Sequence, residues 1–124
     1  MNHGVMKLKI IRKFILGTAF EHTWKDLGLN DDDLRRLQTD LLENPKAGSV
    51  IRGTGRMRKL RFAYENRGKS GSSRVCYVDF EDKEIIYLLA MFSKNQQENL
   101  TKAECNILKK KIDMLEKICK GEII

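Results

Sequence analysis

Residues 57–92 read MRKLRFAYENRGKSGSSRVCYVDFEDKEIIYLLAMF, and this segment alone predicts most of a sheet. Residues 57–64 alternate as strand residues do, with one face made of Arg58, Leu60, Phe62 and Tyr64 and the other of Lys59, Arg61 and Ala63. Residues 65–73 are rich in Gly and Ser and predict a turn or loop. Residues 74–80 and 84–92 predict two more strands, and the continuous apolar character of the last favours a central position. Short connections between these strands predict a meander.

A strand and two helices are predicted before this segment. Residues 7–14 have the apolar pattern of a first strand, and residues 18–27 that of a short helix. Residues 31–43 predict a stronger helix, because Asn30 is a favourable N-cap and leucines recur at helical spacing. The pair Asn44-Pro45 ends this helix, since the residue before proline disfavours helical backbone.

A loop and a final helix complete the predicted architecture. Residues 46–55 contain three glycines and predict a loop. The last helix covers residues 102–120 and begins with a capping box, in which Thr101 is the N-cap and Glu104 the third helical residue. The sequence therefore predicts an α+β fold, a small antiparallel meander sheet flanked by helices, as a single domain over residues 1–124.

The positive charge of the chain is concentrated in one segment. The net charge is +7, and between residues 52 and 74 eight basic residues oppose a single acid, Glu65, so this segment alone carries the whole excess. The eight are Arg52, Arg56, Arg58, Lys59, Arg61, Arg67, Lys69 and Arg74. Such a concentration is typical of a site for a polyanion. A strand that carries charge only for solubility and edge protection would explain Lys59 and Arg61. It would not explain why Lys69 and Arg74 lie close to them in the sequence.

Cysteine and histidine usage indicates a reducing compartment and no metal. The three cysteines, Cys76, Cys105 and Cys119, are odd in number and form no Cys-x-x-Cys motif, which favours buried reduced thiols in a cytoplasmic protein. The two histidines, His3 and His22, lack neighbours at metal-ligand spacing. No apolar run approaches the roughly 18 residues of a membrane span, so we expect no membrane association and no signal peptide.

The placement of the basic residues favours phosphate chemistry. Lys59 and Arg61 share one face of a strand, Arg74 enters the neighbouring strand, and Lys69 lies on the connection between them. Arginine and lysine bind a phosphodiester through charge-assisted contacts. They also stabilise the charge that develops when an RNA 2′-OH attacks the adjacent phosphate, without a metal or other cofactor. A lysine crowded by other cations is also a candidate general base.

Three further residues are candidates for contact with RNA. Tyr64 ends the basic strand and is the tyrosine best placed to stack on a base. Arg58 belongs to the same strand, and Arg56 to the loop before it. Arg56, like Arg52, is explained equally well as an ordinary loop charge.

An ordered set of short motifs runs from the end of the second predicted helix to the last one. The motifs are Asn44-Pro45, Gly48, Val50-Ile51, Gly53-Thr54-Gly55, Arg58-Lys59-Leu60-Arg61, Gly68-Lys69-Ser70-Gly71, Arg74-Val75, Tyr77, Tyr87-Leu88-Leu89, Phe92-Ser93-Lys94-Asn95 and Glu98-Asn99-Leu100-Thr101. Each motif alone is weakly specific. In this order, the set resembles HigB-type toxins of the RelE/ParE toxin–antitoxin superfamily, from Leu29 to the final helix.

The resemblance implies a function, partners and site residues. It implies the toxin of a type II toxin–antitoxin system, a ribosome-dependent, metal-independent endoribonuclease that cleaves translated mRNA and inhibits translation. The implied partners are the ribosome, mRNA and a cognate HigA-like antitoxin with a helix-turn-helix domain, through which alone the toxin would meet operator DNA. The expected catalytic residues are Lys59, Arg61, Arg74 and Lys94. The expected RNA-binding residues are Arg56, Arg58, Tyr64 and Lys69.

Two other functions are compatible with a basic domain of this kind. One is a toxin without enzymatic activity that binds a protein target such as DNA gyrase, because the same superfamily contains such members. The other is a nucleic-acid-binding domain that does not cleave. The clustered cations favour the endoribonuclease, because a protein target does not require several cations converging on one phosphate-sized spot.

Overall fold

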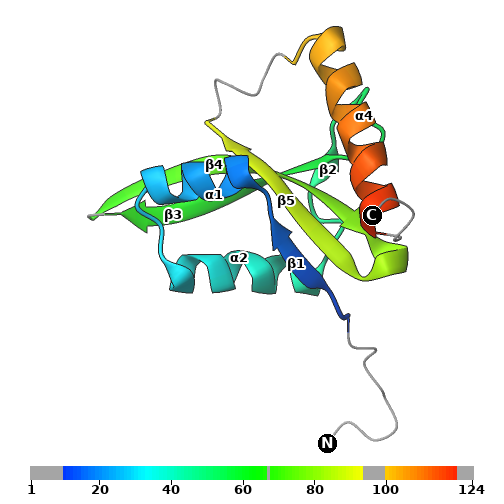
Figure 1. Ribbon diagram of the computed structural model, residues 1–124. Helices are drawn as coiled ribbons and strands as arrows, with labels where there is room; N and C mark the ends of the chain where they lie inside the picture. The colour runs from blue at the N-terminus through cyan, green and yellow to red at the C-terminus, as the bar shows by residue number, and fades with distance from the viewer. Residues whose placement is uncertain (1–9, 67, 94–99, 120–124) are drawn as a thin grey trace, which may run out of the picture.

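The computed structural model describes residues 10–66, 68–93 and 100–119. Its five strands form one sheet in the order β1-β5-β4-β3-β2, and its helices flank that sheet (Figure 1). The prediction of an α+β fold is confirmed. Along the chain the elements are β1 (Lys13–Leu16), α1 (Thr18–Asp26), α2 (Asp31–Glu43), β2 (Ser49–Val50), β3 (Arg58–Asn66), β4 (Lys69–Phe80), the short 3-10 helix η1 (Glu81–Lys83), β5 (Ile85–Phe92) and α4 (Lys102–Cys119).

The sheet is mixed, which corrects the prediction of a purely antiparallel one. The pairs β2–β3, β3–β4 and β4–β5 are antiparallel, as the meander predicts. Strand β1 instead pairs with β5 in parallel, with Lys13 beside Ile85 and Leu16 beside Leu88. The first strand was predicted at residues 7–14, of which 7–9 lie outside the described residues. It is observed further along the chain, where Phe14 and Leu16 pack against the core.

The β3–β4 hairpin is longer than predicted, and the prediction of a loop over residues 65–73 is wrong. Strand β3 continues to Asn66, and β4 already begins at Lys69. Tyr64 faces Gly71 across the hairpin, and its ring lies so close that a methyl group on Gly71 would be 2.9 Å from it. This aromatic cover compensates for the missing glycine side chain, so a Gly- and Ser-rich stretch forms a strand. The short β2 was also not predicted, because the glycines around it indicate a loop.

One face of the sheet is covered by α1 and α2. Its core includes Phe20 and Trp24 of α1, Leu37 and Leu41 of α2 and Phe62 of β3. The ring centroids of Phe20 and Trp24 are 5.4 Å apart, and those of Trp24 and Phe62 are 5.7 Å apart. Burial of these side chains explains why the apolar residues of both helices recur at helical spacing.

The opposite face of the sheet packs against α4, and we call it the α4 face. Its core contains Cys76, Val78, Phe80 and Leu89 of the sheet together with Ile112 of α4. A bulge between Cys76 and Tyr77 shifts the β4–β5 register, and both Leu89 and Ala90 belong to this second core. In Figure 1, α4 lies over the β2 end of the sheet, so the tip of the β3–β4 hairpin projects beyond it.

The predicted helix starts are confirmed. The side chain of Asn30 accepts a hydrogen bond from the Asp33 amide at 2.9 Å, and the Asp33 carboxylate accepts one from the Asn30 amide at 3.0 Å. The same reciprocal pair joins Thr101 and Glu104, with both distances 3.1 Å. Such boxes satisfy amides that have no partner within the helix. Among the described residues, no helix is long and apolar enough to cross a membrane.

Candidate active site

Arg61 of β3 and Arg74 of β4 are direct cross-strand partners. The carbonyl of Ala63 accepts a hydrogen bond of 2.8 Å from Arg36 of α2, so it points to the outer edge of β3 and not toward β4. Backbone groups alternate along a strand, so those of Arg61 point outward too. Arg61 and Arg74 therefore form a non-hydrogen-bonded pair, the closer kind, with Cα atoms about 4.5 Å apart. Two guanidinium groups rise from one spot on the sheet.

Lys59 belongs to the same face of the sheet. It pairs with Cys76, whose side chain is fully buried in the α4-face core. Burial raises the pKa of the Cys76 thiol to about 12, while the positive charge of Lys59 acts in the opposite direction. Because Lys59 and Arg61 are two residues apart on one strand, all three cations lie on the α4 face. We call Lys59, Arg61 and Arg74 the basic cluster.

The charges of the basic cluster are not neutralised within the part of the chain that the structure describes. None of the described carboxylates forms an ion pair with Lys59, Arg61 or Arg74. Lys59 and Arg74 are half-buried and Arg61 is exposed, so an anion can approach from solvent. Directly opposed like charges destabilise a sheet. An anion bound between them, such as a phosphate, would offset that repulsion.

A buried hydroxyl holds the loop that lies against Lys59. The Tyr77 hydroxyl accepts a 2.9 Å hydrogen bond from the Gly48 amide and donates a 2.8 Å bond to the Pro45 carbonyl. A methyl group on Gly48 would lie only 2.7 Å from the Lys59 carbonyl oxygen. Arg58 adds a 2.6 Å hydrogen bond to the Gly48 carbonyl. These contacts fix the backbone beside Lys59, so they position one member of the basic cluster.

Of three residues predicted to bind RNA, two belong to the face of the sheet opposite the basic cluster, and the third is engaged by α4. Arg58 and Tyr64 alternate with the cluster residues, so they belong to the opposite face of the sheet. The guanidinium of Arg58 is engaged by the loop, and the Tyr64 hydroxyl lies 3.4 Å from the Ser73 hydroxyl. Arg56 forms an ion pair with Glu116 of α4, and its guanidinium lies 4.7 Å from the centre of the Phe80 ring.

The two predicted lysines are only partly covered by the structure. Lys69 is the first residue of β4 and pairs with Asn66, and its side chain is not among those described. Lys94 lies outside the described residues. The structure thus brings together Lys59, Arg61 and Arg74, three of the four residues predicted to be catalytic.

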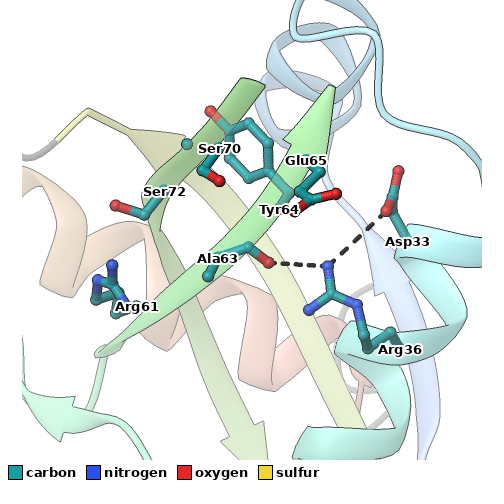
Figure 2. A pocket seen from close by; sticks show the side chains of 9 residues that line it. Asp33, Arg36, Arg61, Ala63, Tyr64, Glu65, Ser70 and Ser72 are labelled. Carbon is teal, nitrogen blue, oxygen red and sulfur yellow. Dashed lines mark hydrogen bonds and ion pairs between the residues drawn. The ribbon is translucent and has the colours of Figure 1, made fainter. Parts of the chain in front are cut away.

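A hollow adjoins the basic cluster through Arg61. It has a volume of about 680 Å³ and curves around the outer edge of β3 (Figure 2). Sequence reasoning missed it, because its β4 wall was assigned to a loop. Strand alternation extended through residues 65–73 would have indicated it. Its lining residues are Asp33, Arg36, Arg61, Ala63, Tyr64, Glu65, Ser70, Gly71 and Ser72.

The chemistry that this arrangement supports is binding of a phosphodiester and stabilisation of added negative charge on it. Three cations lie on one face of two paired strands, and two of them are arginines with a planar fork that matches phosphate oxygens. In the described part of the chain, no three His, Cys, Asp or Glu side chains are grouped so that they could hold a metal. Fold and site together define a small α+β protein with a cluster of cations on one face of its sheet.

Comparison with known families agrees with that definition. Residues 13–123 match the family described as the RelE toxin of the RelE/RelB toxin–antitoxin system. The chain belongs to this family, and so to the RelE/ParE superfamily that its motifs resemble. It is therefore the toxin of a toxin–antitoxin pair, and membership implies an antitoxin partner.

A solved structure supports the fold. The chain is similar to a free-state mutant of the E. coli toxin RelE that carries two arginine-to-alanine substitutions, with a TM-score of 0.51 and 15% sequence identity. The match covers 73% of this chain and 90% of the E. coli chain. At this level of identity, the likeness concerns the arrangement of the sheet and helices.

Proposed function

We propose that this toxin is a ribosome-dependent, metal-independent mRNA endoribonuclease of the HigB type, which arrests translation by cutting the message. The observation that carries the proposal is the cross-strand pair Arg61–Arg74 with Lys59 on the same face. Three cations without carboxylate partners among the described residues suit a substrate whose phosphate brings the missing negative charge.

In the proposed reaction the 2′-OH of one nucleotide attacks the adjacent phosphorus and the 5′-oxygen of the next nucleotide leaves. The phosphate gains negative charge in the transition state. Arg61 and Arg74 are placed to stabilise that charge, because both are held on adjacent strands before substrate arrives. Lys59 is the candidate for the proton transfer at the 2′-OH, and Lys69 and Lys94 are candidates for further basic contacts along the RNA.

The proposed partners follow from family membership and charge. The antitoxin is proposed to be HigA-like, with a helix-turn-helix domain that contacts operator DNA on behalf of the pair. The ribosome is proposed to present the mRNA. The concentrated positive charge of residues 52–74 suits contact with the phosphates of both ribosomal RNA and mRNA.

Primer extension on a translated message tests this proposal. Purified toxin is added to a reconstituted translation reaction, and the 5′ ends of the mRNA are mapped with and without ribosomes. We expect new ends within the translated region, only in the reaction with ribosomes. A triple variant, Lys59→Ala/Arg61→Ala/Arg74→Ala, should give none, whereas Lys25→Ala should behave like the parent, because this exposed charge lies on α1 across the sheet.

The same experiment, together with a growth assay and a DNA supercoiling assay, distinguishes the two alternatives. Growth arrest by the parent without new mRNA ends, together with inhibition of DNA supercoiling, would contradict the proposal in favour of a gyrase-directed toxin. A stalled ribosome without cut message would favour a domain that binds RNA but does not cleave it. If the parent and the triple variant give the same new mRNA ends in the same amount, the basic cluster has no part in cleavage.

A further inference from the structure

The α4 face of the hairpin carries a strip of three small residues and one glutamate, which starts at the Arg61–Arg74 pair. The next cross-strand pair toward the tip is Ala63 with Ser72, and the one after it is Glu65 with Ser70. Residues directly opposite each other in an antiparallel pair share a face, so these side chains continue the surface of the basic cluster. We call Ala63, Glu65, Ser70 and Ser72 the shelf.

The shelf is open and of suitable size. All four residues line the hollow of about 680 Å³, which is within the roughly 300–1,000 Å³ typical of small-molecule sites. Ala63, Glu65 and Ser70 are exposed, and Ser72 is half-buried. The strand advances about 3.3 Å per residue, so Glu65 lies about 13 Å from Arg61 along β3. Figure 2 shows Arg61 at one end of the lining residues and Glu65 toward the other.

The shelf is held from the other side of the sheet. Tyr64 covers Gly71 on the opposite face, where a methyl group would meet the ring at 2.9 Å. The outer edge is held by Arg36, which bonds to the Ala63 carbonyl and lies 4.4 Å from the centre of the Phe62 ring. A surface supported on its back and edge is preorganised for a ligand on its front.

We propose that the shelf binds the base of a nucleotide flanking the scissile phosphate and prefers a base with an exocyclic amino group, namely adenine, cytosine or guanine, over uracil. This inference rests on the proposed ribonuclease function and adds the residues that choose the substrate. The phosphate end of the nucleotide belongs at Arg61 and Arg74. The negative charge of Glu65 repels phosphate, so the base and not the backbone occupies the far end of the shelf.

Glu65 provides the selectivity. A carboxylate only accepts hydrogen bonds, and an exocyclic amino group only donates them, so the two match. No described residue forms an ion pair with the Glu65 carboxylate, whereas the Asp33 carboxylate in the same hollow accepts a hydrogen bond from the Asn30 amide. The Ser70 and Ser72 hydroxyls can each donate and accept hydrogen bonds, so they can bind the edge of any base. They add affinity but little selectivity among bases. The small side chain of Ala63 leaves the room that a base needs.

Filling the shelf tests whether it is used. Ala63→Ile places a branched side chain on an exposed strand position, where such residues favour strand structure, so folding is not at risk. We expect cleavage of translated mRNA to fall by at least about tenfold, the usual effect of misfit in a pocket. Ala19→Ile, the same substitution at an exposed position of α1 on the other face of the sheet, should cleave like the parent. Equal cleavage by the parent and both variants would overturn the proposal.

Changing Glu65 tests the base preference. In the parent, sequencing of cleaved ends should show uracil depleted at one fixed position beside the cut. Glu65→Gln can donate as well as accept, so it should reduce that depletion by roughly tenfold while cleavage continues. An unchanged uracil frequency in Glu65→Gln, or no base bias at either flanking position in the parent, would contradict the role of Glu65.

A binding measurement separates failure of the shelf from failure of the ribonuclease proposal. The probe is a fluorescent RNA trinucleotide of adenines with 2′-deoxyribose at the first two positions, so that it cannot be cut. If the parent cuts no mRNA, the proposed function fails, yet the shelf still predicts that Ala63→Ile binds this probe more weakly than Ala19→Ile. Equal binding by the two variants, with the parent binding the probe, would overturn the shelf alone.

Discussion

Arg61 and Arg74 stand directly opposite each other on β3 and β4, two like charges in the position where neighbouring strands usually place complementary side chains. The sheet keeps this unfavourable pair next to Lys59 and without a carboxylate in the described part of the chain. Repulsion stored in the free protein can be released when a phosphate binds. In the proposed function, a bound phosphate offsets the repulsion by which this pair lowers the stability of the free toxin.

Replacing one arginine of this pair should stabilise the fold. Arg61→Gln removes one exposed charge and keeps most of the side-chain length. We expect the free energy of unfolding to rise by about 0.2–1 kcal/mol at low salt, the usual size of a cross-strand pair term. The gain should shrink in about 1 M salt, because screening already weakens the repulsion in the parent. Urea denaturation at both salt concentrations measures this, and a loss of stability at low salt would contradict it.

The Tyr77 hydroxyl should contribute more to the free energy of unfolding than the hydroxyl of a partly exposed tyrosine does. Tyr77→Phe leaves the Gly48 amide and the Pro45 carbonyl without their buried partner. We expect the free energy of unfolding to fall by about 1–3 kcal/mol. Tyr87→Phe, at a half-buried position in β5, is the matched control and should change it by less than about 0.5 kcal/mol. Equal effects in urea denaturation would show that the loop is held by other contacts.

The ion pair between Arg12 and Asp79 should dominate the electrostatic contribution to stability. Their closest atoms, Nε and Oδ1, are 2.7 Å apart, and the two side chains are only 10% and 4% exposed. The hydrogen bond to Asp79 raises the pKa of Arg12. Asp79→Ala leaves a largely buried guanidinium without its carboxylate, with only the hydrogen bond to the Ile11 carbonyl remaining, and should cost about 3–5 kcal/mol. Asp32→Ala breaks the exposed pair with Arg35 and should cost under about 1 kcal/mol. Similar costs in thermal denaturation would contradict this.

Stability should decline at alkaline pH because of Cys76. Burial raises the pKa of this thiol from 9.0 to about 12 in the folded chain. The unfolded chain therefore loses the proton first, and the contribution to stability is lost as pH rises from about 9 toward 12. Cys76→Ala should show a shallower decline in urea midpoints between pH 8 and about 10.5. The raised pKa of Tyr77 acts in the same direction in both proteins and cancels in the comparison. Equal slopes would contradict the burial argument.

Local pattern accounts for much of the fold and for part of the site. Alternation within residues 57–64 is enough to predict that Lys59 and Arg61 share a face, and the capping boxes at Asn30 and Thr101 locate two helix starts. The same alternation already separates Arg58 and Tyr64 from that face. Their predicted role in RNA binding came from their place on the basic strand, and that role stays a prediction.

Register and long-range pairing are what local pattern does not contain. Arg74 lies opposite Arg61 because the hairpin turns between Asn66 and Lys69. The Gly- and Ser-rich composition of residues 65–73 instead predicted that the turn or loop occupies that whole segment. The cover of Gly71 by Tyr64 is a contact between strands, so it is invisible along the chain. The parallel pairing of β1 with β5 joins segments separated by the entire meander. The shelf was missed for the same reason as the turn.

The most direct test of the central claim is the rate of mRNA cleavage by single variants of the basic cluster in a reconstituted translation reaction. We expect Arg74→Ala to lower this rate by about 100- to 1,000-fold, as loss of one charge-stabilising group in a transition state does, while its circular dichroism spectrum stays native. Lys25→Ala, an equal loss of charge on α1, should cleave at the parental rate. Folded Arg74→Ala that cleaves as fast as Lys25→Ala would contradict the account.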